Sequence, residues 1–345
     1  MSPLSIARFL PLLVLALPAC AESSGVAPGA VPSPPVLDED DLWSMVPAEA
    51  DLVLWVDMDK LRVSPWTRDG FAKVEAESAR DGAAGLEPMR DVDRLIFAKV
   101  PSLRDGATVL VAQGKIDRER ILKSFLRDHA ESGAGMYRGA KLHERGEEAL
   151  AFVGKQTVIS GLTVAVRAAI DCNFGVARAI ESESWFARLR TDLLPRRDAS
   201  SLVAALYVHL QPATREALVQ EMGEGGTLEE FAGRVDLAGD LDASVLGVVR
   251  TEREAQDMAA RLNGRMRDAR VRPIVAAFGL ARVLDSVVFE AKDTQVRGTL
   301  HVSESERADI AQRMAIAADT MARMRRAENR TGNKPEESPQ EKKDP

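Results

Sequence analysis

The strongest constraint on the fold of this chain is a pattern of strand, polar break and helix that occurs twice. Ala50–Arg68 (ADLVLWVDMDKLRVSPWTR) aligns with Ser200–Leu218 (SSLVAALYVHLQPATREAL), and each stretch passes from an apolar strand through a polar break into a helix start. Short apolar runs bounded by turn residues are typical of strands. We therefore expect a mixed fold in which one structural unit is used twice.

Two further pairs of segments keep the same order along the chain. Arg90–Val100 pairs loosely with Gly233–Ala243 through a shared Val-Asp. Val109–Asp128 pairs with Val245–Asp268, and each of these is a strand that runs into a capped helix. Because order as well as type is kept, we interpret the body as an internal duplication. The alternative is two unrelated α+β domains, which would share the same succession of strands and helices.

Each copy is expected to read β-α-β-β-α, followed by a β-hairpin and a helix. The hairpin strands are expected near Met136–His143 and Ala149–Ile159 in the first copy, and at Val287–Ala291 and Gln295–Val302 in the second. Successive strands joined by tight turns favour antiparallel pairing. The sequence therefore predicts an α+β fold of two similar lobes, each a mostly antiparallel sheet with helices packed on one face.

Two helix starts carry a capping box, in which a hydroxyl and a carboxylate each bind a free backbone amide of the first turn. The two pairs are Thr251 with Glu254 and Ser303 with Glu306. We expect a helix to begin directly after each hydroxyl residue.

The predicted organisation has a leader, a tether, two lobes and a tail. We expect a signal peptide at residues 1–19, a proline-rich tether at 20–42, a first lobe at 43–195, a second lobe at 196–326 and a tail at 327–345. The tether and the tail contain too few apolar residues to form a core, so both should stay extended and solvated.

The leader has the anatomy of a secretory signal. Arg8 precedes the apolar run Phe9–Leu17, which is much shorter than the roughly 20 residues that a membrane-spanning helix needs. The sequence Leu17-Pro18-Ala19-Cys20 then resembles the lipobox of bacterial lipoprotein precursors, with Pro18 in the place of the usual small residue. The resemblance implies that Cys20 becomes the first residue of the mature chain and carries acyl chains such as palmitate.

A second cleavage site is also present in the leader. The small-x-small pattern Ala19-Cys20-Ala21 fits general signal peptidase, which would release a chain beginning at Glu22. By resemblance to Gram-negative lipoproteins, Ala21 after the cysteine implies transfer to the outer membrane. The expected location is therefore the cell envelope, lipid-anchored through Cys20 and facing the periplasm.

Composition and motifs exclude several classes of chemistry. The 53 acidic and 46 basic residues give a net charge of −7 without a basic stripe, so nucleic acid is not an expected partner. The only cysteines are Cys20 and Cys172, which excludes a disulfide framework. None of the 4 histidines has a second histidine or a cysteine at metal-binding spacing. We therefore expect no metal, no cofactor and no catalysis.

Asp57 and Asp59 form the one acidic pair that stands out. They alternate with Val56 and Met58, so we expect both carboxylates on one face of a strand. Such a pair could perform general acid and base catalysis or bind a cation. The same alternation is also typical of any half-exposed strand.

Three functions remain open from the sequence. The first is a non-catalytic, membrane-anchored binding or scaffold module with a protein partner in the envelope. The second is a periplasmic carrier of a lipid or small hydrophobic ligand, held in a cavity between or within the lobes. The third is a carboxylate-dependent hydrolase that uses Asp57 and Asp59.

Overall fold

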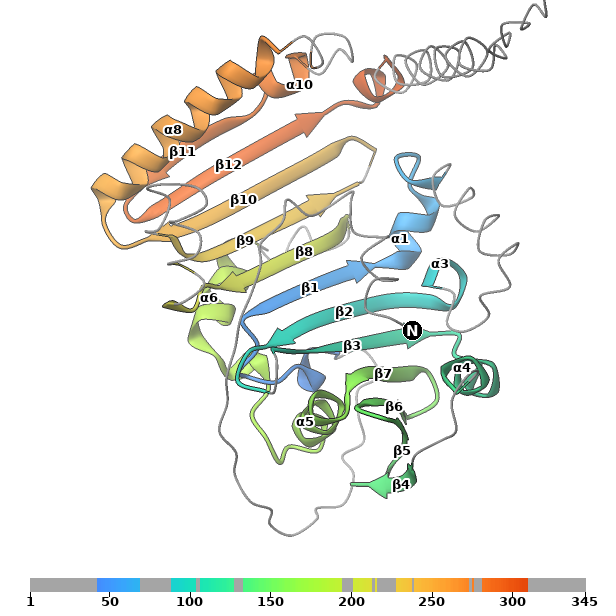
Figure 1. Ribbon diagram of the computed structural model, residues 1–345. Helices are drawn as coiled ribbons and strands as arrows, with labels where there is room; N and C mark the ends of the chain where they lie inside the picture. Colours follow the sequence, from blue (N-terminus) through green and yellow to red (C-terminus); the bar gives the residue numbers. More distant parts are fainter. Residues whose placement is uncertain are drawn as a thin grey trace, which may run out of the picture.

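One antiparallel sheet forms the body of the protein (Figure 1). The computed structural model describes residues 42–68, 88–103, 106–126, 133–193, 201–212, 215, 228–237, 239–272, 275 and 281–309. The predicted signal peptide, the predicted tail and all but the last residue of the predicted tether lie outside these ranges. The 12 strands follow the order β11-β12-β10-β9-β8-β1-β2-β3-β7-β6-β5-β4 across the sheet.

The strands divide into a first half, β1 to β7, and a second half, β8 to β12. The first half contains β1 (Leu52–Asp57), β2 (Val92–Val100), β3 (Ala107–Gly114), β4 (Gly133–Tyr137), β5 (Ala140–Arg145), β6 (Glu148–Val153) and β7 (Thr157–Leu162). The second half contains β8 (Leu202–His209), β9 (Leu228–Asp236), β10 (Leu241–Val249), β11 (Val288–Lys292) and β12 (Gln295–Val302). The helices are η2 (Leu42–Met45), α1 (Met58–Val63), α3 (Pro88–Asp91), α4 (Arg118–Phe125), α5 (Thr163–Asn173), η3 (Ile180–Ser182), α6 (Ser184–Leu193), α8 (Glu252–Arg270) and α10 (Ala281–Asp285).

The two halves meet edge to edge where β1 pairs with β8, so the two predicted lobes share one continuous sheet. Outward from this seam the order is β1-β2-β3-β7-β6-β5-β4 on one side and β8-β9-β10-β12-β11 on the other, so the first half has two more strands at its outer edge. The five strands next to the seam are thus ordered alike in the two halves, while the internal duplication stays a prediction. The alignment of Arg90–Val100 with Gly233–Ala243 is wrong, because Val92 opens β2 whereas Val235 lies near the end of β9.

The α+β class and the antiparallel sheet are confirmed, but helices cover both faces of the sheet and not one. Val111 and Ala112 are neighbours on β3 and therefore point to opposite faces. Val111 packs in the core with residues of α5 and α6, whereas Ala112 packs with Ile121 of α4. We call these the α5–α6 face and the α8 face. Both faces of the central strands are apolar, so both need a cover.

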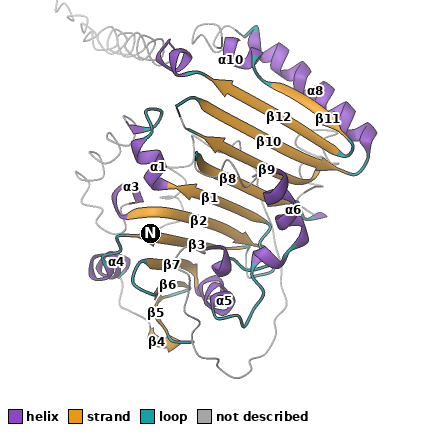
Figure 2. Cartoon of the chain, turned by 180° about the vertical axis from the view of Figure 1, so that it is seen from behind, coloured by secondary structure: helices purple, strands orange, loops and turns teal. Residues whose placement is uncertain are grey.

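The α8 face takes its name from the long helix beside the outer strands of the second half (Figures 1 and 2). Ala255 and Ala259 of α8 pack against Val296 of β12, which points away from the α5–α6 face. The capping box of Thr251 and Glu254 starts this helix as expected. The box of Ser303 and Glu306 is confirmed as well, with N···O distances of 2.8 and 3.3 Å.

Of the two predicted hairpins, the one in the second half is confirmed and the one in the first half is wrong. The hairpin of the second half is confirmed as β11 and β12, joined at Asp293, which has a positive φ of 53°. The expected first-half hairpin is wrong, because that region is a meander of β4, β5, β6 and β7. Two extra tight turns, at Arg138-Gly139 and at Gly154, split the two expected strands.

Candidate functional site

The outer strands of the second half carry an exposed, polar sheet surface. On the α5–α6 face, α6 packs over β8, β9 and β10. Beyond β10, the side chains on this face of β12 and β11 are exposed, except for the half-buried Gln295. We call this surface the open face; it consists of Asp242, Val288, Glu290, Lys292, Arg297, Thr299 and His301. Acidic and basic side chains alternate across it, which suits contact with a polar partner surface.

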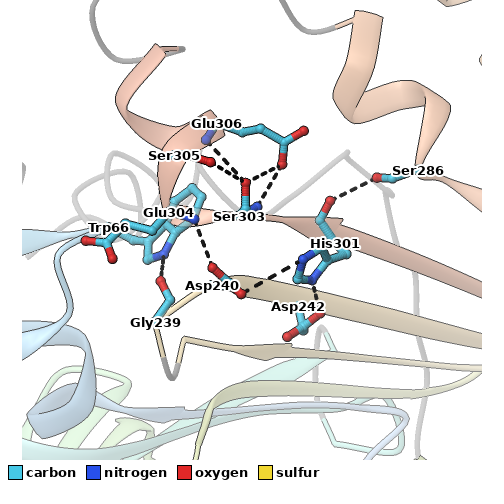
Figure 3. A network of polar contacts seen from close by, with 10 residues as sticks. All are labelled: Trp66, Gly239, Asp240, Asp242, Ser286, His301, Ser303, Glu304, Ser305 and Glu306. Carbon is cyan, nitrogen blue, oxygen red and sulfur yellow. Dashed lines mark hydrogen bonds and ion pairs between the residues drawn. The ribbon is translucent and has the colours of Figure 1, made fainter.

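His301 lies at one end of the open face, between two carboxylates (Figure 3). It sits opposite Asp242 in the register of β10 and β12, and its Nδ1 is 2.8 Å from Asp242 Oδ1. Its Nε2 is 3.9 Å from Asp240 Oδ2, in the loop between β9 and β10. The hydrogen bond with Asp242, followed by the charges of Asp242, Asp240 and Glu306, raises the pKa of His301 above its ordinary value.

The same network links three segments that are far apart in the sequence (Figure 3). Asp240 Oδ1 accepts a hydrogen bond of 2.9 Å from the backbone N–H of Glu304, at the start of the helix after β12. Trp66 Nε1 donates to Gly239 O at 2.9 Å. The guanidinium of Arg307 lies over the Trp66 ring, 5.7 Å from its centroid, and donates to Pro65 O at 2.9 Å. The network therefore joins the chain after α1 to the end of the second half.

Replacing Asp242 by asparagine is expected to lower the pKa of His301 toward about 6.5, the usual value for a free histidine. Because the folded-state pKa is raised, this interaction stabilises the protein fully at pH below about 6.5 and is lost as the pH rises through the folded-state pKa. NMR titration of the His301 ring signals measures the change. Asp268→Asn, on the exposed surface of α8, is the control. Equal His301 pKa values in all three proteins would contradict the assignment.

Asp57 and Asp59 do not lie on one strand face, so that expectation is wrong. β1 ends at Asp57, whose carboxylate accepts from the backbone N–H of Lys60 at 3.0 Å and caps α1. Asp59 lies inside α1, is largely exposed and pairs with Arg62. An aspartate after a strand favours a helix cap because its side chain reaches the free amides. The alternation of apolar and polar residues suggested a strand and gave no sign that Asp57 caps a helix. The two carboxylates have separate partners.

Cys172 is a buried free thiol, while Cys20 lies outside the described residues. Burial, with the charges of Glu49 and Asp171, raises the pKa of Cys172 to about 12. Its Sγ lies 3.3 Å from Arg178 O. A thiol of this kind stays protonated at neutral pH and packs as a small apolar group.

A buried carboxylate that the sequence analysis missed lies beneath α6. Glu230 faces His209 across β8 and β9, and Arg188 of α6 donates to both of its oxygens. Burial raises the pKa of Glu230, but the nearby His209 ring and Arg188 outweigh burial, and the net pKa is lowered. The Trp185 ring stacks on His209 at 5.3 Å. These residues are distant in the sequence, and no local spacing marks them as a group.

Metal sites and membrane-spanning helices are both missing from the part of the chain that the structure describes. No group of three or more His, Cys, Asp or Glu side chains among the described residues is placed to hold a metal ion. In the same part of the chain, no helix is both long and apolar enough to cross a membrane.

Comparison with known proteins identifies similar solved structures only. No protein-family model and no curated protein matches the sequence. Crystal form III of TP0453 is similar with a TM-score of 0.45 and 11% identity, over 79% of this chain and 98% of that chain. Crystal form IV of TP0453 gives a TM-score of 0.46 and 11% identity, over 79% of this chain and 96% of that chain.

Proposed function

We propose that the chain is a non-catalytic lipoprotein of the bacterial cell envelope whose open face binds another envelope protein. The observation that carries the binding role is the open face itself. It extends over β10, β12 and β11, and both signs of charge are exposed on it. Mixed charges give an interface its register and select against wrong partners.

The anchor in this proposal rests on the sequence Leu17-Pro18-Ala19-Cys20. Each buried methylene of an acyl chain contributes about 0.8 kcal/mol to membrane binding, so several chains on Cys20 hold the protein firmly. The proline-rich residues after Cys20 would separate the folded body from the bilayer. We place this anchor in the outer membrane, with the body in the periplasm.

Mass spectrometry of the mature amino terminus tests the anchor. We expect an acylated Cys20 as the first residue, and we expect Cys20→Ser to move the protein from the membrane to the soluble fraction. An unmodified chain that begins at Glu22 would overturn the anchored part of the proposal and leave the binding part to be judged separately.

Site-specific photo-crosslinking in the intact envelope tests the binding role. A crosslinker at Thr299, on the open face, is expected to capture one specific protein. The matched control carries the crosslinker at Lys155, an exposed residue between β6 and β7. Arg297→Glu should reduce capture from Thr299 without changing the background at Lys155. The same products from both positions would overturn the binding role of the open face.

A further inference from the structure

The sheet has two edges, and the edge at β11 is closed by a side chain of α8. β11 and β12 form a hairpin whose turn is flanked by the register pair Lys292–Gln295. In an antiparallel pair, hydrogen-bonded and non-hydrogen-bonded positions alternate from such a closing pair. Phe289 is therefore a position whose N–H and C=O point away from β12. The Asn263 side chain binds both groups, at 3.0 Å to the N–H and 2.8 Å to the C=O.

The other edge, β4, has the same geometry without such a cover among the described residues. β4 and β5 are joined by the two-residue turn Arg138-Gly139, with φ of 47° and 83°, and the closing pair is Tyr137–Ala140. The same alternation makes Ala134 and Met136 the positions whose backbone groups point away from β5. Both residues are exposed, Met136 to 69%.

β4 also lacks the features by which proteins protect an edge strand. Charged side chains, prolines and β-bulges discourage pairing at an edge. The strand reads Gly-Ala-Gly-Met-Tyr, and its register with β5 runs without a shift. By contrast, β11 contains Glu290 and Lys292 in addition to the Asn263 contact. The edge at β11 is thus protected by the Asn263 contact and by charged side chains, and among the described residues the edge at β4 has neither.

We propose that β4 pairs with β4 of a second copy of this chain, antiparallel and about a two-fold axis at Gly135. Ala134 and Met136 lie symmetrically on either side of Gly135, so each Ala134 meets a Met136 of the other copy. Because both residues direct their backbone groups outward, the two pairs exchange N–H···O bonds in both directions. The strand is therefore complementary to itself in one register.

The side chains of β4 suit the same register. Met136 lies opposite Ala134 of the other copy and on the same face, which makes an apolar cross-strand pair. Gly135 meets Gly135, and a Cβ built at Gly135 has no atom within 4 Å in one copy. No like charges meet within the strand, because it carries none. A two-fold contact of this kind is closed, so it produces a dimer and not a filament.

Disulfide trapping tests the register in the chain that follows the signal peptide, with Cys20→Ser so that the result does not depend on the anchor. In this background Cys172 is buried and does not compete. Gly135→Cys places two thiols across the axis and should give a disulfide-linked dimer under mild oxidation. Ala134→Cys is the matched control, because its two thiols lie two positions out of register, beyond the roughly 7 Å Cα limit for a disulfide. Equal trapping by both variants, or none by Gly135→Cys, would overturn the proposal.

Analytical ultracentrifugation of the same chain, without either added cysteine, measures the dimer dissociation constant and so tests the β4–β4 contact independently. Proline is tolerated on an edge strand where the N–H points outward, so Met136→Pro should fold while removing an outward donor from each copy. We expect dimerisation weaker by at least about tenfold, with an unchanged unfolding temperature at protein concentrations where both proteins are monomeric. A monomer at every concentration before substitution, or a series of larger oligomers, would overturn the two-fold pairing. If Met136→Pro does not fold, the comparison of Gly135→Cys with Ala134→Cys still decides whether two copies pair through β4.

Discussion

Replacing Phe186 by alanine is expected to lower the free energy of unfolding by about 3–5 kcal/mol. The Phe186 side chain is 1% exposed, and its ring centroid lies 5.0 Å from that of Tyr207 and 5.2 Å from that of Trp43. Alanine would lose the transfer free energy of the ring and leave a cavity that these large neighbours cannot fill. The effect should be large because Phe186 lies on α6, which covers the strands next to the seam between the two halves.

Urea unfolding followed by far-UV circular dichroism measures this loss. Val164→Ala is the control, because Val164 is 43% exposed at the start of α5 and its truncation should change stability by no more than about 0.5 kcal/mol. Phe186→Leu should fall between the two, since it keeps part of the buried volume. Similar stabilities for Phe186→Ala and Val164→Ala would show that α6 does not pack on the sheet as described.

Replacing Gly114 by alanine is expected to destabilise the protein by about 3 kcal/mol or more. A Cβ at Gly114 would lie 2.1 Å from Asp91 O, 2.8 Å from Asp93 N and 2.9 Å from Val92 Cα. All of these are backbone atoms where α3 ends and β2 begins, and the register of β2 with β3 shifts between Val92 and Arg94. A flexible side chain could rotate away, but here the strand itself must move.

The matched substitution is Gly264→Ala in the interior of α8. No atom lies within 4 Å of a Cβ at Gly264, so alanine should stabilise the helix by up to about 1 kcal/mol. Thermal and urea unfolding of the two variants should therefore change in opposite directions. A Gly114→Ala protein as stable as the unsubstituted chain would contradict the close approach of β2 and β3 at this point.

Features that depend on neighbouring residues were predictable from the sequence. Thr251 with Glu254 and Ser303 with Glu306 each form a capping box within one helical turn. The hairpin of β11 and β12 was predictable for the same reason, because its turn and its strands are continuous in the chain. Asp57 is the exception among local features. Its place at the end of a strand fits both an exposed strand position and a helix cap, and only the turn of the backbone at Met58 distinguishes the two.

The candidate site was not predictable, because its members come from separate segments. His301 gains its carboxylate neighbours only when β12 pairs with β10, and Trp66 reaches Gly239 only across the boundary between the halves. Glu230, His209 and Arg188 meet in the same way, from β9, β8 and α6. No short spacing encodes these contacts, since each depends on which strands are neighbours in the sheet.

The sequence by itself determined the class of the fold, the helix starts after Thr251 and Ser303, and the expectation of a lipid anchor at Cys20, because these follow from local patterns of apolar, capping and leader residues. Only the tertiary structure decided that β1 and β8 join the halves into one sheet and that helices cover both of its faces. It also decided that α8 closes the edge at β11 while the edge at β4 is exposed. The physical reason is that pairing between distant strands is selected by burial and register over the whole sheet, and neither is a property of a single segment.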